Sequence, residues 1–295
     1  MTPAHLKAAL ETLYRSRSQQ HLANDPLAFC HRYQHREDRE IAALLASCFA
    51  YGAVGVIRGS LERIFGELGP SPRRYLERLD PRLAAETFAG FKHRFNDGRD
   101  LAALLWAIRQ IRHQAGTIEA FFLRFHDRQA PTVEAGLIGF ADAVLALDYS
   151  PVFGEQGLPQ RASYRFLFPS PASGSACKRL CMLLRWLVRP ADGIDLGLWH
   201  GVHPRQLIIP VDRHIERIGQ LLGLSDRRTP DWRMACQITD NLRRLDPDDP
   251  VKYDFSLCHL GISEGCTGSP GASCIRCMVR GLCAADKRID RVARF

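Results

Sequence analysis

The chain has 295 residues, a formal net charge of +8 and a sequence pI near 9.1. Its hydrophobic content of 46% and charged content of 24% are ordinary for a soluble globular protein of one large domain or two lobes. No apolar run reaches the roughly 18 residues of a membrane span, and the N-terminal residues lack the apolar core of a signal peptide. We therefore expect a cytoplasmic protein rather than a membrane or secreted one, with a polyanionic partner favoured by the positive charge.

Apolar residues recur at three- and four-residue steps along most of the chain, which predicts amphipathic helices. Asp38 has the character of a helix cap, and no stretch alternates apolar and polar residues in the manner of a strand. The segment 150–173, rich in Pro, Ser and Gly, is the longest non-helical stretch. The fold class is therefore predicted to be all-α. The predicted helices are a short N-terminal one, 38–50, 54–68, 72–79, 99–114, 117–127, 132–147, 179–189, one starting at Asp212, 231–245 and 250–262.

Four cysteines, Cys266, Cys274, Cys277 and Cys283, follow the pattern C-x7-C-x2-C-x5-C. Four thiolates within eighteen residues can close around one metal centre, and loops of this kind hold 4Fe-4S clusters or structural zinc. The spacing alone leaves both alternatives open. The other six cysteines lie on apolar helical stretches, where we expect small buried side chains rather than ligands.

Only five of the 40 basic residues are lysines, which indicates that a lysine kept in so arginine-rich a chain has a chemical role. One of them ends a glycine-containing turn, Ser173-Gly-Ser-Ala-Cys-Lys178, that leads into a predicted helix. A lysine amine hemmed in by protein loses solvation, so its pKa falls and it becomes a nucleophile toward a sugar C1′. The turn itself can offer backbone N–H groups to a DNA phosphate.

A second pattern, Val211-Asp212-Arg-His214, starts a later helix with Asp212 at its N-cap. Backbone N–H groups and the helix dipole keep a carboxylate ionised at that position. Such a carboxylate can stabilise an oxocarbenium-like centre and manage proton transfers. We expect His214 to be an ordinary exposed or hydrogen-bonded helix residue.

The order of these pieces resembles the C-terminal half of the helix-hairpin-helix DNA glycosylases of the endonuclease III superfamily. Those enzymes have a Leu-Pro-Gly-Val-Gly-x-Lys turn, a Val-Asp-Thr-His helix start and a C-x6-C-x2-C-x5-C cluster loop. Residues 170–285 carry the resemblance well, including Tyr253-Asp-Phe-Ser-Leu-Cys-His-Leu-Gly261 before the loop. Residues 38–80 carry it loosely. Phe49 and Tyr51 follow the first long helix, where related enzymes insert a residue into the duplex, and we favour core positions for both.

The sequence also departs from that pattern. Ala176 replaces the second hairpin glycine, and the first cysteine gap is seven rather than six. Lys178 and Asp212 are 34 positions apart, about twice the usual separation, because of the insertion 190–201. A longer gap and an altered hairpin are similar to the archaeal 8-oxoguanine glycosylases. The chain looks most like an uncharacterised bacterial family related to these enzymes.

The resemblance implies a two-lobed all-α fold. Residues 36–190 would form a helical barrel ending in the degenerate hairpin at about 170–189, and 1–35 with 200–295 would form a cluster lobe containing the loop 266–283. The resemblance favours a 4Fe-4S cluster over zinc. It also implies a cytoplasmic or nucleoid location in a bacterium. The implied site residues are Lys178 and Asp212 for catalysis, Ser173, Gly174, Ser175, Ala176 and Arg179 for nucleic-acid binding, and the four cysteines of the loop for the metal.

The implied function is base-excision repair of double-stranded DNA by a monomeric glycosylase. The damaged base would be flipped from the stack, with an oxidised purine favoured, and a lysine Schiff base would add AP-lyase activity. The alternative is a catalytically silent or RNA-directed nucleic-acid-binding protein with a structural iron–sulfur cluster.

Overall fold

The computed structural model describes residues 2–17, 19–160 and 162–286. This part of the chain is mostly helical, which confirms the all-α prediction, and none of its helices is long and apolar enough to cross a membrane. The α-helices are α1 (Pro3–Arg15), α2 (Arg36–Cys48), α3 (Val54–Leu68), α4 (Pro72–Glu77), α5 (Pro81–Thr87), α6 (Gly98–Ala115), α7 (Ile118–Phe122), α8 (Glu134–Leu145), α9 (Ser150–Phe153), α10 (Lys178–Val188), α11 (Arg213–Leu221), α12 (Trp232–Arg243) and α13 (Asp254–Ile262). The short 3-10 helices are η1 (Gln19–Asn24), η2 (Pro26–Arg32), η3 (Ser163–Leu167), η4 (Pro171–Ser173), η5 (Pro204–Gln206), η6 (Ala272–Arg276) and η7 (Arg280–Leu282).

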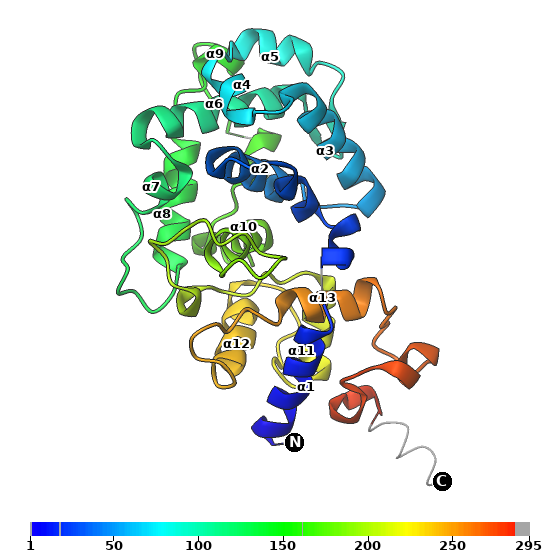
Figure 1. The fold of residues 1–295 in the computed structure, drawn as a ribbon. Coiled ribbons are helices and arrows are strands. Elements are labelled where there is room, and N and C mark those ends of the chain that lie inside the picture. The colour runs from blue at the N-terminus through cyan, green and yellow to red at the C-terminus, as the bar shows by residue number, and fades with distance from the viewer. Residues whose placement is uncertain (1, 18, 161, 287–295) are drawn as a thin grey trace.

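The helices gather in two groups with α10 between them (Figure 1). Helices α2 to α9 form one group, and α2 packs directly against α10. Helices α1, α11, α12 and α13 form the other group, in which α1 and α11 both contact α13. Segments from the two ends of the chain therefore lie together in the second group. Buried apolar side chains run continuously through both groups.

The start of α2 differs from the sequence prediction. The helix begins at Arg36, and Asp38 lies within its first turn with its side chain buried. Asp38 Oδ1 accepts a hydrogen bond from the backbone N–H of Arg73 at 2.7 Å, and the Ser71 hydroxyl lies 3.2 Å away. Asp38 is thus not an N-cap of its own helix, because its carboxylate holds the start of the neighbouring helix α4.

A small antiparallel ladder also departs from the sequence prediction of no strands. Strand β1 (Lys92–His93) pairs with β2 (Asn96–Asp97) through the register Lys92↔Asp97 and His93↔Asn96. Two residues per strand are too few for an alternating pattern to be visible in a sequence. The turn between the strands contains Arg94 with φ of +56°, in the left-handed region that favours glycine.

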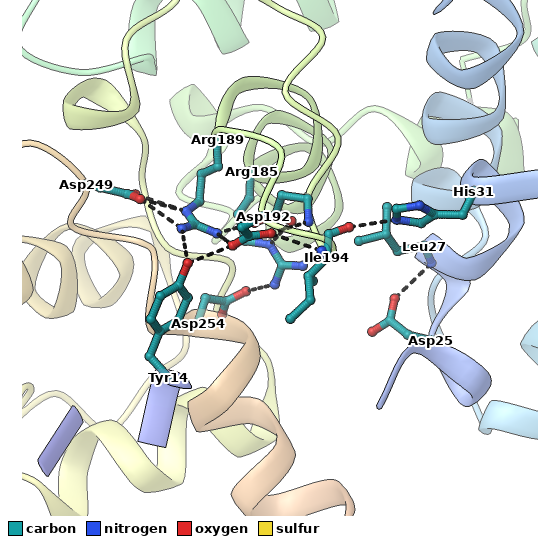
Figure 2. A network of polar contacts seen from close by, with 11 residues as sticks. Tyr14, Asp25, Leu27, His31, Arg185, Arg189, Asp192, Ile194, Asp249 and Asp254 are labelled. Atoms are coloured by element: carbon teal, nitrogen blue, oxygen red, sulfur yellow. Dashed lines mark hydrogen bonds and ion pairs between the residues drawn. The ribbon is translucent and has the colours of Figure 1, made fainter. Parts of the chain in front are cut away.

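Two buried arginines, Arg185 in α10 and Arg189 directly after it, are ion-paired with carboxylates of the second group and of the segment 190–201 (Figure 2). Arg185 Nε donates to Asp195 Oδ1 at 3.1 Å, and its Nη1 is ion-paired with Asp254. Arg189 bonds Asp195 as well, and its ion pair with Asp249 is 2.9 Å long. Each arginine has at least two carboxylate partners, so replacing an arginine would leave buried carboxylates without their cation, which costs about 3 to 5 kcal/mol.

The segment 190–201, which lengthens the separation between Lys178 and Asp212, packs along α10. The amide of Leu196 donates to the carbonyl of Trp186 at 2.7 Å, and the amide of Trp199 donates to that of Leu187 at 2.7 Å. Trp199 Nε1 also donates to Glu40 Oε1 at 2.8 Å. The extra residues are therefore part of the core and supply Asp195, on which both buried arginines converge.

Candidate functional site

A cleft of about 560 Å³ opens beside α10, where the two groups of helices meet. Lys178 and Asp212 both line it, although they are 34 positions apart in the sequence. Its walls come from the start of η2 and the residues before it, the loop after α2, the start of α3, helix α10, the start of α11 and helix α13. The other ionisable or thiol side chains that line it are Asp25, Tyr51, Arg185, Arg213, His214, Asp254, Cys258 and His259.

Lys178 is the first residue of α10 and is half-buried. The residue before it, Cys177, has φ of +48°, which is uncommon for a residue with a side chain. Lys178 Nζ donates a hydrogen bond to the backbone carbonyl of Ala50 at 3.2 Å. This bond directs the amine across to the chain that leaves α2, at the wall of the cleft.

Asp212 caps α11, as the sequence predicts. Its Oδ1 accepts from the backbone N–H groups of His214 at 2.8 Å and of Ile215 at 2.9 Å. Its Oδ2 lies 3.4 Å from the sulfur of Cys258, a thiol that can donate to it. These three donors fix the direction of the carboxylate at the wall of the cleft.

Two further carboxylates at the cleft were not among the sequence predictions. Asp25 caps η2 by accepting from the amide of Leu27 at 2.8 Å (Figure 2). Burial raises the pKa of Asp25, although the charges of Arg185 and Lys178 act in the opposite direction. Burial likewise raises the pKa of Asp254, to about 6, against the pull of its ion pair with Arg185. A single aspartate in a short 3-10 segment carries no motif that a sequence reading could detect.

His214 is a hydrogen-bonded helix residue, and it also faces the cleft. Its Nδ1 lies 3.1 Å from a guanidinium nitrogen of Arg217, and burial lowers the pKa of His214. Gly261 on α13 lies against the imidazole, since a Cβ at that position would stand only 2.0 Å from Nδ1. The glycine is thus needed for α13 to pass close to the start of α11.

The glycine turn predicted to contact phosphate lies at the surface beside α12. Ser173 and Gly174 are exposed, while Ser175 and Ala176 are half-buried. The carbonyl of Gly174 accepts from the amide of Trp232 at 3.0 Å, which fixes the turn to the start of α12. The turn stays open to solvent on its outer side, so the structure keeps it available to a ligand.

Arg179, predicted to bind nucleic acid, is instead buried. Its guanidinium donates to the carbonyl of Cys48 at 3.1 Å and to that of Phe166, and stacks 3.9 Å from the Phe166 ring. An arginine whose N–H groups are directed to backbone carbonyls inside the protein is not presented to a phosphate. Arg179 directly follows Lys178 on α10, so the two side chains point to different faces of the helix, and the face that carries Arg179 is buried.

The four cysteines of the terminal loop line one pocket together with apolar side chains of α11 and α13. None of them forms a disulfide. Within the described ranges, however, no three Cys, His, Asp or Glu side chains stand close enough together to hold one metal ion directly. Arg217 of α11 donates to the carbonyl of Cys266 and so brings a positive charge to the side of this pocket.

The chain belongs to the family described as protein of unknown function (DUF2400), whose model matches residues 25–263. The match includes every residue that lines the cleft except Asn24, and it ends before the four cysteines. Comparisons with curated proteins and with solved structures found no match.

Proposed function

We propose that this protein is a DNA glycosylase that removes a damaged base extruded into the cleft. The observation that carries the proposal is the meeting of a lysine amine and a helix-capping carboxylate in one solvent-accessible cleft. The positive net charge of the chain supports a polyanionic substrate. The resemblance of the Lys178 turn and the Asp212 helix start to the endonuclease III superfamily supports the same chemistry.

In the proposed reaction the unprotonated amine of Lys178 attacks C1′ of the extruded nucleotide. The C1′–N bond to the base breaks, its electron pair leaves with the base, and the base takes up a proton. The C1′–O4′ bond of the sugar ring then breaks, the nitrogen gives up its protons, O4′ takes up one of them, and an imine forms between Lys178 and C1′. The carboxylate of Asp212 stabilises the positive charge that develops on the sugar. Asp25, whose pKa is raised by burial, is the group that would supply the proton to the departing base.

We further propose that Cys266, Cys274, Cys277 and Cys283 hold a 4Fe-4S cluster. Four free thiols that line one pocket support a metal–thiolate centre. The resemblance of their spacing to the cluster loop of the endonuclease III superfamily favours iron–sulfur over zinc. The cluster would supply metal–thiolate bonds that hold the terminal loop against α11 and α13.

Borohydride trapping tests the reaction. The parent protein, incubated with duplexes carrying single uracil, 8-oxoguanine or abasic lesions, should form a covalent adduct with one of them. Lys178→Gln and Lys178→Arg should both abolish the adduct, because neither side chain offers an unprotonated amine. Lys7→Gln is the matched control, since Lys7 is exposed on α1, and it should trap as the parent does.

Two outcomes would redirect the proposal. If Lys178→Gln releases the base as fast as the parent, the nucleophile is a water molecule or another lysine, and replacing each remaining lysine would separate these cases. If the parent binds lesion DNA but releases no base from any duplex, the protein is a nucleic-acid binder without catalysis. An affinity for RNA above that for DNA would make it RNA-directed.

A further inference from the structure

Two exposed phenylalanine rings touch each other at the surface near the cleft. Phe95 is 45% exposed and Phe166 is 43% exposed, and their ring centroids lie 4.6 Å apart. They come from different elements, since Phe95 is in the turn between β1 and β2 and Phe166 is in η3. We call this pair the aromatic shelf. Exposed apolar side chains are usually scattered singly, so a contacting pair indicates an interaction surface.

The shelf rests on a rigid base. The Tyr51 ring lies 5.0 Å from Phe166 and 5.6 Å from Phe95. The Tyr51 hydroxyl donates to the carbonyl of His93 at 3.1 Å, and the buried guanidinium of Arg179 stacks beneath Phe166. The two phenyl rings are therefore held in place while each remains partly exposed to solvent. This is the pre-organised state that makes stacking of a flat ligand inexpensive in entropy.

The turn that carries Phe95 also has an unusual backbone. Arg94 and Cys177 are the two residues other than glycine with positive φ in the described chain. Cys177 directly precedes Lys178, and Arg94 directly precedes Phe95. Strained backbone conformations of this kind cluster at functional sites. One of these two residues therefore precedes the lysine of the cleft, and the other precedes a phenylalanine of the aromatic shelf.

The shelf adjoins the cleft. Tyr51 lines the cleft, and the carbonyl that accepts from Lys178 belongs to the preceding residue, Ala50. The charges around the shelf are positive, because Lys92 and Arg94 are exposed on the same hairpin.

The acidic side chains nearby are engaged within the fold. Asp97 caps α6, and Asp100 is buried, accepting from Asn96 at 2.6 Å and from Ser163 at 2.6 Å. The surface thus offers two partly exposed rings, set edge to face at 79°, with cations beside them.

We propose that the aromatic shelf stacks on an unpaired nucleobase of the DNA held at the cleft. A nucleobase has two flat π faces and is attached to a phosphate backbone, so it matches both the rings and the cations beside them. The inference rests on the proposed function, since extrusion of one nucleotide leaves neighbouring or opposite bases without their partners. It adds a contact outside the cleft that would favour duplexes with disrupted pairing.

The test is a comparison of affinities measured by fluorescence anisotropy. Lys178→Gln protein is used throughout so that no reaction consumes the DNA. One duplex is fully paired and the other contains a single unpaired base opposite an abasic-site analogue. Protein with both phenylalanines should bind the second duplex more tightly than the first. Phe95→Ala or Phe166→Ala should reduce the ratio of the two affinities about tenfold. Affinity for the fully paired duplex should stay unchanged.

Three further variants make the result specific. Phe166→Trp keeps a π face and should retain the preference, whereas Phe166→Leu keeps apolar area without one and should lose it. Leu83→Ala, at a residue of α5 that is 60% exposed, is the control for removing an exposed apolar side chain. Thermal unfolding of each variant confirms that the fold is retained, and Phe95 at the tip of its turn provides a second variant if a change at Phe166 disturbs Arg179.

The outcomes separate this inference from the proposed function. An undiminished preference in both alanine variants, or full retention by Phe166→Leu, overturns stacking. No preference in the unmodified shelf overturns it as well. If the preference is present and falls as expected, but the parent protein releases no base, the shelf is confirmed and the glycosylase proposal fails.

Discussion

Cys258 holds one oxygen of Asp212 while the helix holds the other. The Cys258 sulfur lies 3.4 Å from Oδ2, and Oδ1 accepts from the amides of His214 and Ile215. Burial raises the pKa of the Cys258 thiol well above its ordinary value, and the charge of Asp212 acts in the same direction. The thiol therefore keeps its proton at neutral pH and can donate it. Helix α13 in this way sets the direction of a carboxylate on α11.

This contact predicts that Cys258→Ala slows base release about fivefold and leaves DNA affinity nearly unchanged. One of three hydrogen bonds to the carboxylate is lost, which corresponds to about 1 kcal/mol. Single-turnover kinetics on lesion duplex measures the effect. Cys258→Ser should restore most of the rate, and Cys236→Ala, a half-buried cysteine of α12, is the control. A rate equal to that of the parent would show that the thiol does not position Asp212.

Protein purified without oxygen should be brown, with a broad absorbance near ~400 nm and about four irons per chain. Cys274→Ala should lose most of the iron and make the terminal loop susceptible to proteolysis, because metal–thiolate bonds organise a loop with little apolar content. Cys30→Ala, a buried cysteine far from the loop in the sequence, should keep its iron. One zinc and no iron per chain would replace the cluster with a zinc site.

The buried imidazole of His259 should make the protein less stable in acid. Burial, together with the charge of Arg17, lowers the pKa of His259 to about 4. Between about pH 6.5 and about pH 4 the unfolded chain binds a proton that the folded protein does not. The free energy of unfolding therefore falls as the pH is lowered through this window, by at most about 3 kcal/mol.

Urea unfolding of the parent and of His259→Gln at pH 7 and pH 5 measures this contribution. The variant should lose less stability than the parent on acidification, since it has no imidazole to protonate. His5→Gln, at an exposed residue of α1, should follow the parent. Equal losses in all three proteins would mean that His259 does not control acid stability.

The left-handed backbone at Arg94 predicts a difference between two substitutions. Arg94→Gly should be more stable than Arg94→Ala by about 1 kcal/mol, because a Cβ at φ of +56° is disfavoured. Both variants lose the same side-chain contacts, so the comparison isolates the backbone term. Chemical denaturation measures it. If alanine proves as stable as glycine, the turn relaxes out of the left-handed region and presents Phe95 differently.

Apolar periodicity predicted most helices to within a few residues, because a helix that packs on a core needs a repeating apolar face. The helix predicted at 54–68 has those bounds in the structure, and the one predicted at 231–245 is found at Trp232–Arg243. Asp38 was misread because its buried carboxylate serves a neighbouring helix. The β1–β2 ladder was missed because two-residue strands have no detectable period.

Sequence motifs placed Lys178, Asp212 and the four cysteines as candidates, and the structure brings each set to a common cleft or pocket. The motif reading failed for Arg179, since sequence proximity to a turn does not reveal which side of a helix is buried. Phe49 is buried as expected, whereas Tyr51 lines the cleft. Asp25 and the aromatic shelf depend on contacts between distant segments, which a local pattern does not encode.

The packing of α1 against α13 has a consequence for synthesis of the chain. Glu11 of α1 accepts a hydrogen bond from the hydroxyl of Tyr253 and pairs with Lys252, each at 2.6 Å. At translation rates of about 5–20 residues per second, α1 would wait roughly 10 to 50 s for these partners to be made. Its three buried leucines stay exposed for that time. Helix α1 can therefore reach its final place only after residues 252 and 253 have been made, and a chaperone that binds short apolar helices would protect it until then.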